Sequence, residues 1–231
     1  MTKQVLSLLL IFSLYSSYAQ VQDAELWTGI GIESKLIKKL SAELTIQNRL
    51  NNNMSVVKNT YGQFGLDYKI SSKIDAGLTY RLARKNKLEY YESVHRLCLN
   101  ANYSYKIKKT GLSFKVRARY QYSFDRFSTI NPYILPDQKS LYRIKLTTAY
   151  KIKSLKVIKP FINGEVFFGL DQDVKHELLT YRLSGGINVI PNKRHTIKVR
   201  YIFENNFEDI PNVNHIYAVT YQYDLKGKLF N

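Results

Sequence analysis

The sequence predicts an all-β protein, an up-and-down antiparallel transmembrane β-barrel of 10 to 12 strands with short periplasmic turns and longer extracellular loops. Three observations predict this fold class. The chain opens with an export signal, and the rest alternates apolar and polar residues with period two in segments long enough to cross a membrane as β-strand. The gaps between these segments alternate between short and long, as in outer-membrane barrels.

The first element is a secretory signal peptide over residues 1–19. Lys3 precedes an apolar stretch at residues 5–14, and the small residues Ser17 and Ala19 form the cleavage site. The apolar stretch is shorter than the roughly 20 residues that a membrane-spanning helix needs. We therefore expect cleavage after Ala19 and a single outer-membrane barrel domain over the rest of the chain, residues 20–231.

Eleven segments follow in which side chains alternate between two faces. In chain order they are 24–34, 40–50, 59–70, 74–82, 93–107, 112–122, 142–150, 160–170, 179–190, 197–203 and 213–224. The alternation is cleanest in 112–122, where Leu, Phe, Val, Ala and Tyr occupy one face and Ser, Lys, Arg and Gln the other. The segments 74–82, 142–150 and 197–203 repeat this division, and the other seven are noisier. A membrane barrel accounts for both faces, because the apolar face contacts lipid and the basic face points into the enclosed lumen.

The gaps support the same topology. Short turns are expected at 35–39, 71–73, 108–111, 153–159 and 191–194, and longer loops at 51–58, 86–92, 124–138, 171–178 and 205–212. Bacterial single-chain barrels have an even number of strands, so eleven segments lead us to expect 10 or 12 strands. The first segment is the one most open to exclusion, since it would begin on the extracellular side.

The composition limits the partners. There are 35 Lys and Arg against 18 Asp and Glu, a formal net charge of +17, together with 19 Tyr and 11 Phe. Basic and aromatic residues also characterise nucleic-acid-binding proteins, but an exported protein does not meet nucleic acid. We expect outer-membrane lipid and lipopolysaccharide as partners, the barrel-assembly machinery during insertion, a monomer in the bacterial outer membrane, and no cofactor.

A basic lumen is the strongest candidate for a functional site. The predicted inward-facing cations are Lys115, Arg117, Arg119, Arg143, Lys145, Arg182, Lys198 and Arg200, and the candidate counter-charges are Glu43, Asp75, Glu165 and Glu204. Like charges on adjacent strands repel unless counter-charges or water intervene. The cluster is interpreted either as a salt-bridged plug, which suits a barrel of this size, or as an anion-favouring lumen.

Two other sites are weaker alternatives. Ser93 and His95 share a strand face with Glu92 beside them, which is the minimum for an outer-membrane lipid hydrolase of the deacylase or phospholipase type. No nucleophile elbow or third orienting group accompanies them. The acidic loop with Asp171, Asp173, His176 and Glu177 holds possible ligands for a divalent cation, but it lacks the ligand spacing and turn glycine of a calcium loop.

The opening of the mature chain resembles a known family. Glu25-Leu26-Trp27-Thr28 follows a signal ending in Tyr18-Ala19-Gln20, and a Lys-rich turn leads into residues 44–50 and then Asn51-Asn52-Asn53. In these features the chain resembles the short outer-membrane barrels of Bacteroidetes-type bacteria known as domain of unknown function 2490. The resemblance implies a barrel and an outer-membrane location and brings no catalytic residues. The alternating Tyr217, Val219, Tyr221 and Tyr223 are similar to the carboxy-terminal strand that barrel-assembly machinery recognises, except that Phe230 is penultimate.

These observations predict a structural, binding or narrow anion-pore barrel, with a lipid hydrolase as the alternative.

Overall fold

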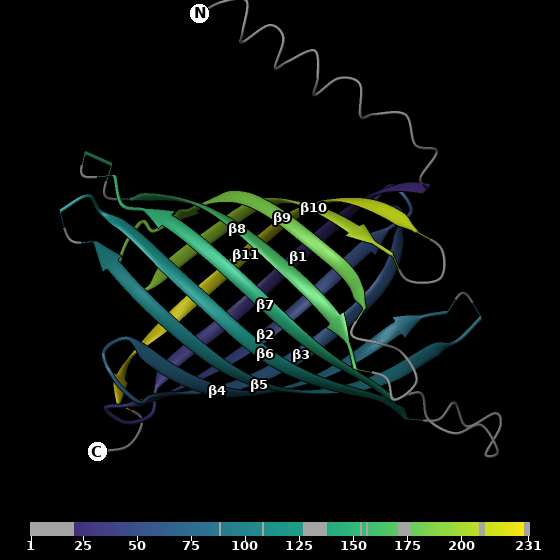
Figure 1. Cartoon of the computed structure of the whole chain (residues 1–231), viewed down its shortest axis with the longest axis horizontal. Helices are drawn as coiled ribbons and strands as arrows, with labels where there is room; N and C mark the ends of the chain where they lie inside the picture. Colours follow the sequence, from purple (N-terminus) through teal and green to yellow (C-terminus); the bar gives the residue numbers. More distant parts are fainter. Residues whose placement is uncertain are drawn as a thin grey trace, which may run out of the picture.

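The computed structural model describes residues 21–87, 89–107, 109–126, 138–152, 154–155, 157–170, 177–207 and 211–228. Within these residues, eleven strands close into a single barrel (Figure 1). No helix in the described part of the chain is long and apolar enough to cross a membrane. The predicted fold class, an all-β up-and-down barrel, is confirmed.

Each predicted segment corresponds to one strand. The strands are β1 (Val21–Lys35), β2 (Leu40–Asn51), β3 (Val56–Lys69), β4 (Ile74–Asn86), β5 (Tyr91–Ile107), β6 (Leu112–Arg126), β7 (Gln138–Tyr150), β8 (Ile158–Gly169), β9 (Leu178–Val189), β10 (His195–Asn206) and β11 (Asn212–Lys228). They are 12 to 17 residues long, which exceeds the 9–11 residues of β-strand that cross a hydrocarbon core. Every strand is therefore long enough to be part of a membrane wall.

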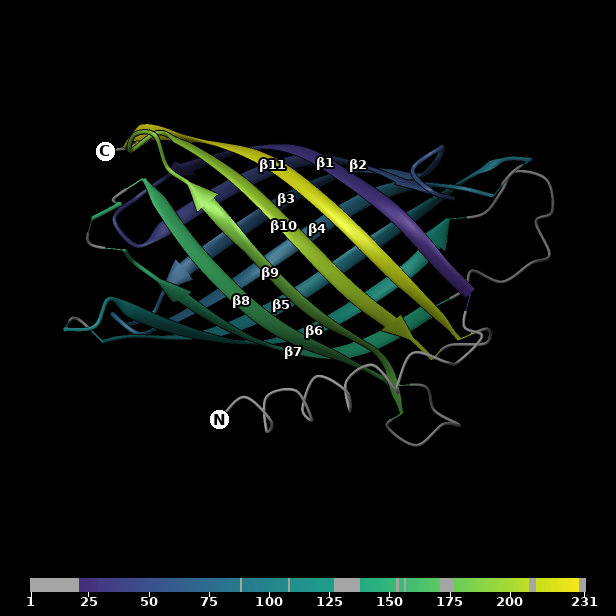
Figure 2. The same cartoon turned by 90° about the horizontal axis from the view of Figure 1, so that it is seen from above.

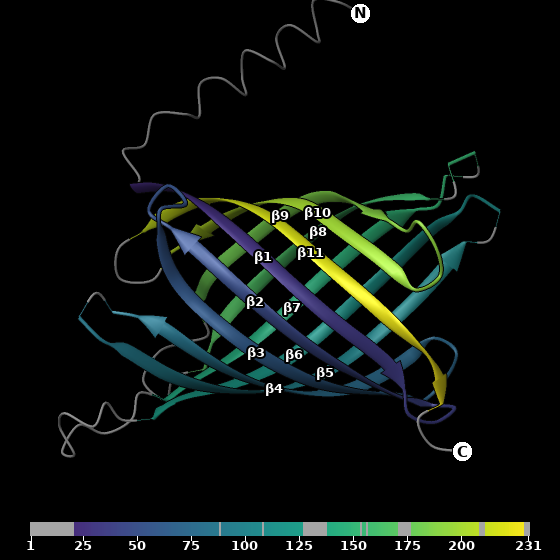
Figure 3. The ribbon, with the colours of Figure 1, turned by 180° about the vertical axis from the view of Figure 1, so that it is seen from behind.

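The expectation of an even strand number is wrong. Consecutive strands pair antiparallel, but β1 pairs with β11 in parallel, with Val21 beside Asn212 and Ser34 beside Leu225. This parallel ladder lets an odd number of strands close without leaving an unpaired edge. Figures 2 and 3 show β1 (purple) and β11 (yellow) side by side along the barrel. The first segment, which was the most open to exclusion, is thus a wall strand with a full set of partners.

The connections divide between the two ends of the barrel. We call the end with the β1–β2, β3–β4, β5–β6, β7–β8 and β9–β10 connections the short-turn end, and the opposite end the long-loop end. At the long-loop end, the loop predicted at 51–58 is instead a turn between Asn51 and Val56. The backbone φ angles of Asn52, Asn53 and Met54 are 50°, 52° and 66°, and the amides of Asn52 and Asn53 donate to the Asp23 carboxylate at 3.0 and 2.8 Å. This left-handed turn reverses the chain within four residues, so the strands extend into the predicted loop.

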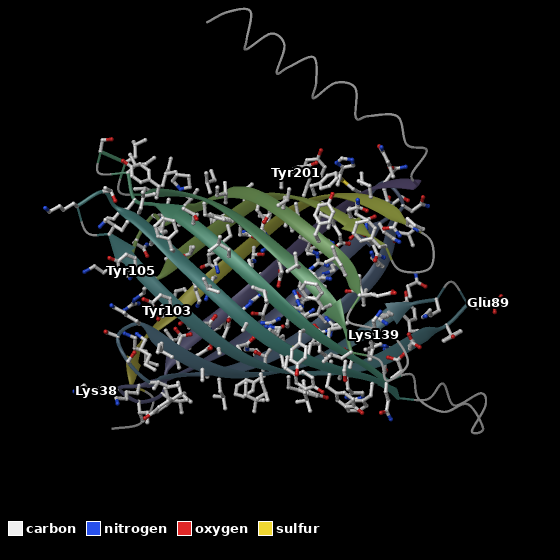
Figure 4. The ribbon with its side chains drawn as sticks, viewed as in Figure 1. Lys38, Glu89, Tyr103, Tyr105, Lys139 and Tyr201 are labelled. Carbon is white, nitrogen blue, oxygen red and sulfur yellow. The ribbon has the colours of Figure 1, made fainter. Side chains whose placement is uncertain are left out.

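The two faces of the wall differ in the way that a lipid environment requires. Large apolar side chains stay exposed all around the outer face, for example Ile30, Leu44, Leu78, Ile144 and Ile162. A water-soluble monomer does not expose so much contiguous apolar surface, whereas a transmembrane barrel needs it. Tyrosines are also exposed on this surface, and Figure 4 labels Tyr103 and Tyr105 near the short-turn end and Tyr201 on the outer wall.

The inner face is mostly polar, with two apolar clusters in the described residues: one of Tyr61, Ala83 and Val94, and one behind the parallel seam. Trp27, Ile202, Ile216 and Ala218, from β1, β10 and β11, are buried together there. Inside the barrel wall this cluster packs β1 against β10 and β11, so the seam is held by side-chain burial as well as by backbone hydrogen bonds.

Candidate functional site

Cavities follow one another along the bore of the barrel. A cavity of ≈ 340 Å³ lies at the short-turn end, one of ≈ 180 Å³ at the centre, and one of ≈ 330 Å³ at the long-loop end. The cavity at the short-turn end and the central cavity share the lining residues Lys145, Asn163 and Arg200. The central cavity and the cavity at the long-loop end share five arginines. We call these cavities the short-turn vestibule, the central cavity and the long-loop vestibule.

All eight of the predicted inward-facing cations line the short-turn vestibule or the central cavity. Lys115, Lys145, Lys198 and Arg200 lie in the short-turn vestibule, and Arg117, Arg119, Arg143 and Arg182 lie around the central cavity. They come from β6, β7, β9 and β10, where the alternation places every second residue on the inner face.

Glu165 on β8 is the hub of the central cavity. Its Oε1 accepts hydrogen bonds from Arg117 Nη2 at 2.8 Å and from Arg143 Nη2 at 2.9 Å, and its Oε2 lies 4.0 Å from Lys145 Nζ. The carboxylate is buried. A buried carboxylate that meets three cations is well compensated, but it neutralises only one of the three positive charges.

The other ion pairs of the bore lie toward the long-loop end. Arg182 pairs with Glu204 through a short contact, and Glu204 also accepts from Asn214 at 3.0 Å. Lys58 Nζ lies 2.5 Å from Oε1 of the buried Glu25. These pairs cancel part of the positive charge at the long-loop side of the bore.

The four predicted counter-charges differ in whether they contact a cation. Glu165 and Glu204 hold cations inside the bore, and Asp75 lies 3.9 Å from Lys115 Nζ. Glu43 accepts a hydrogen bond from Thr45 at 3.1 Å and lies opposite Glu33 in the sheet register.

Sequence reasoning missed three further arginines of the bore, each of which lies against a polar or aromatic partner. Arg49 stacks over Trp27 with its guanidinium carbon 3.7 Å from the ring centroid, and Arg81 stacks over Tyr61 at 3.8 Å. Arg81 also donates to Gln63 at 2.6 and 3.0 Å. Arg49, Arg81 and Arg96 line the long-loop vestibule. The signal for Arg81 was present, because it falls on the polar face of the clean segment 74–82.

Together these residues give the central cavity a large excess of positive charge. Among the described residues it is lined by one carboxylate, that of Glu165, and by eight cationic side chains: Arg49, Arg81, Arg117, Arg119, Arg143, Lys145, Arg182 and Arg200. Stacked guanidinium groups stay charged and leave N–H groups free to meet an anion. The arrangement is suited to binding small anions.

The candidate hydrolase residues lie on two faces of β5. The His95 Nδ1 is 2.7 Å from the Tyr80 hydroxyl, and its ring stacks on Phe124 at 5.0 Å between centroids. Ser93 follows the same outward alternation, whereas Glu92 lies near Lys85 and Lys87 at 3.8 and 3.4 Å. Glu92 therefore falls on the opposite face of the strand from the serine and histidine.

The candidate metal ligands Asp171, Asp173 and His176 lie outside the described residues, and Glu177 begins the described chain after them. Within the described residues, no group of three or more His, Cys, Asp or Glu is placed to hold a metal ion.

Among solved structures, the chain is similar to outer-membrane barrels. A structure titled "Bacterial polysaccharide outer membrane secretin" matches with a TM-score of 0.54 and 9% identity over 78% of this chain and 63% of that chain. This chain thus spans less than two thirds of that protein. The β-domain of the Bordetella autotransporter BrkA matches at 0.49 with 11% identity, over 75% of this chain and 78% of that one. The translocator domain of the autotransporter NalP from Neisseria meningitidis matches at 0.41 with 9% identity, over 74% and 70%.

The likeness to the secretin shows a shared barrel fold and nothing finer, because so few residues are identical. No curated protein matches the chain. The family model described as "Protein of unknown function (DUF2490)" matches residues 24–215. That range takes in most of the chain, from the start of β1 to the start of β11, and the protein therefore belongs to the DUF2490 family.

Proposed function

We propose that this protein is an integral barrel of the bacterial outer membrane whose bore binds small anions and lets them pass. The observation that carries the proposal is the charge of the central cavity, where eight Lys and Arg side chains and a single carboxylate of the described residues surround ≈ 180 Å³. The proposal deepens the predicted anion-favouring lumen and treats the ion pairs of Glu165 as a constriction within it.

The first argument is electrostatic. Unpaired charges are costly in a narrow bore walled by protein and lipid, so an excess of fixed cations must be balanced by mobile anions. At 4 Å in water, two unit charges attract by about 1 kcal/mol, and the attraction grows as the surroundings become less polar. Anions are accordingly concentrated in the bore, and cations are excluded from it.

The second argument concerns movement. Passage requires several sites that each bind an ion weakly enough to release it. The arginines of the bore are held by partners of different kinds: Arg81 by Gln63, Arg119 by Asn100 at 2.6 Å, and Arg143 by Glu165. Each retains further N–H groups, since a guanidinium carries five. An anion can thus exchange one arginine for the next along the bore.

The outer surface supports the proposed location. The apolar outer wall suits acyl chains, and exposed tyrosines near both ends suit the membrane interfaces. We propose that the long-loop end faces outward and the short-turn end faces the periplasm, with outer-membrane lipid and lipopolysaccharide around the wall and the barrel-assembly machinery as the insertion partner.

Ion selectivity in planar bilayers tests the proposal. Purified, refolded protein is inserted into a bilayer, and the reversal potential is measured across a KCl gradient. We expect a preference for chloride. Arg200→Gln should reduce the chloride-to-potassium permeability ratio about fivefold, because losing one unit charge near the ion removes about 1 kcal/mol. Arg200 is the informative position, since within the described residues it makes no hydrogen bond or ion pair that the substitution would break.

The matched control is Arg84→Gln, which removes the same charge from the exposed outer side of β4, where Arg84 lies 5.4 Å from the Tyr91 ring. The control should keep the wild-type ratio. A wild-type protein without anion preference, or an equal loss in both variants, would contradict the proposed function.

A further inference from the structure

The short-turn vestibule differs from the other two cavities of the bore because no carboxylate of the described residues lines it. Its lining includes six cations and, among the described residues, no carboxylate; the cations are Lys106, Lys115, Lys145, Lys159, Lys198 and Arg200. Lys106 and Lys115 are exposed at the mouth, and the other four are half-buried deeper inside. A pocket of ≈ 340 Å³ is within the usual size range of small-ligand sites.

Half of these cations have protein partners at the edges of the vestibule. Lys115 lies 3.9 Å from Asp75, Lys145 lies 4.0 Å from Glu165, and Lys198 donates to Gln222 at 2.5 Å. Lys106 on β5, Lys159 on β8 and Arg200 on β10 make no hydrogen bond or ion pair with the described residues. Three strands from different parts of the wall thus present uncompensated cations to one space.

Uncharged donors complete the lining. Asn163 on β8 is nine-tenths buried, and its Oδ1 accepts a hydrogen bond from Ser184 at 2.7 Å. This bond leaves the amide N–H groups of Asn163 available to the vestibule, which Asn188, Ser104 and Ser113 also line. Fixed amide donors among cations are a typical arrangement for an oxyanion ligand.

The opposite end of the bore lacks this arrangement. The long-loop vestibule is lined by nine cations as well as by Asp125 and Glu204, but four of the nine form ion pairs: Lys58 with Glu25, Lys85 with Glu92, Arg143 with Glu165 and Arg182 with Glu204. The carboxylates at the short-turn end, Glu33, Glu43, Asp67 and Asp75, belong to β1–β4 and do not line the vestibule. What distinguishes the short-turn mouth is therefore a group of cations on β5, β8 and β10 that have no hydrogen bond or ion pair with the described residues.

We infer that the short-turn vestibule is a binding site for a small dissolved oligoanion that carries at least two phosphate-type groups, such as a diphosphate. The inference rests on the proposed function and deepens it by naming the ligand class and the side of entry. Because three unpartnered cations come from three strands, they suit a ligand with several negative charges close together better than a ligand with a single negative charge. Lysine ammonium groups bind phosphate as point charges and adapt to its position. The barrel wall separates the vestibule from the bilayer, so the ligand enters from solution.

Calorimetric titration tests the site directly. Inorganic pyrophosphate is titrated into the full-length mature protein in a zwitterionic detergent at low chloride, and orthophosphate is titrated for comparison. We expect pyrophosphate to bind at least tenfold more tightly than orthophosphate. Lys106→Gln combined with Lys159→Gln should weaken pyrophosphate binding at least tenfold, and because neither lysine pairs with an acid in the described residues, the substitutions leave no carboxylate without its cation.

Lys38→Gln combined with Lys39→Gln is the matched control, because both lysines are exposed on the β1–β2 turn at the same end of the barrel and neither lines the vestibule; Figure 4 labels Lys38. This control should bind pyrophosphate as the wild type does. Heat-modifiable gel mobility verifies that each variant is folded. Absence of pyrophosphate binding to the wild type, or equal affinity in the folded variant of Lys106 and Lys159, would overturn the inference.

Conductance separates this inference from the proposed function. Pyrophosphate added at the short-turn side should block the current at lower concentration than pyrophosphate added at the long-loop side. If the protein conducts anions but does not bind pyrophosphate, the proposed anion passage stands and the inferred binding site is wrong. If the protein binds pyrophosphate but does not conduct, the inferred binding site stands and the proposed anion passage is wrong.

Discussion

At the scale of single residues, Glu165 controls the balance of charge in the bore. It is buried and contacts Arg117, Arg143 and Lys145 at once. We expect Glu165→Gln to lower the free energy of unfolding by about 1–3 kcal/mol, because the buried Arg143 and the half-buried Arg117 and Lys145 lose their carboxylate. Urea unfolding in detergent micelles, followed by tryptophan fluorescence of Trp27, measures the change.

Glu92→Gln provides the comparison for Glu165→Gln. Glu92 is 17% exposed and meets Lys85 and Lys87 at the long-loop end, at 3.8 and 3.4 Å, where the lysine side chains are 40% and 45% exposed to solvent. Exposed pairs contribute about 0–1 kcal/mol, so this substitution should cost less. Equal costs for the two substitutions would show that Glu165 is not the organising carboxylate of the bore.

The residue scale also shows what the sequence predicts of the site. Arg117 and Arg119 fall on the polar face of a cleanly alternating segment, so their placement on the inner face follows from a period of two. Arg49 was missed although it falls on the same face of residues 40–50 as Glu43, so the period of two also places it in the bore. The grouping of Arg117, Arg143 and Lys145 around Glu165 depends on the register of three neighbouring strands, which no single segment encodes.

At the scale of elements, the alternation within each strand determines which of its side chains face lipid and which face the bore. Ile144 lies at the middle of β7 and is 51% exposed on the outer face, whereas Thr147 on the same strand lines the short-turn vestibule. We expect Ile144→Lys to destabilise the folded barrel by about 2–4 kcal/mol, the cost of a lysine at the membrane midplane. Thr147→Lys should cost less, about 0–1 kcal/mol, since its side chain meets an aqueous space and the repulsion from Lys115 on the neighbouring strand is the main penalty.

Refolding yield and urea unfolding in phospholipid vesicles measure both β7 variants. If Thr147→Lys were the more damaging substitution, the assignment of inner and outer faces would be reversed, and with it the cationic bore.

Turns were less predictable than strands, and the β2–β3 connection shows why. Asn51, Asn52 and Asn53 predict a polar loop, which is the ordinary meaning of such a cluster. The tight left-handed turn depends on the Asp23 carboxylate, which accepts the amides of Asn52 and Asn53 from about thirty residues away in sequence. A local pattern does not contain that partner.

At the scale of the whole molecule, the odd strand number follows from how the first and last strands pair, which no single segment determines. Alternation predicted eleven segments, but the rule of even numbers assumes that the first and last strands pair antiparallel. The parallel β1–β11 ladder removes that condition. The apolar cluster of Trp27, Ile202, Ile216 and Ala218 covers the seam from inside and favours this closure.

Disulfide trapping tests the seam. Thr28 and Val219 are paired across β1 and β11, and both are exposed on the outer face. Neighbouring strands lie about 4.8 Å apart, within the range of Cα separations that a disulfide spans. In a background with the single native cysteine replaced, Cys98→Ser, we expect Thr28→Cys with Val219→Cys to cross-link under mild oxidation. The product should migrate differently on a denaturing gel until it is reduced.

Two further pairs make the result of the seam experiment decisive. Val199→Cys with Val219→Cys joins β10 to β11 and should cross-link whether or not the seam exists, which shows that the oxidation works on this face. Thr28→Cys with Thr220→Cys shifts the pairing by one residue, so that one side chain points into the bore and no cross-link should form. If only the β10–β11 pair formed, β1 would not be paired with β11 in this register. The barrel would then lack the continuous wall that keeps lipid away from the cations of the bore, and the charge argument for an anion passage would fail with it.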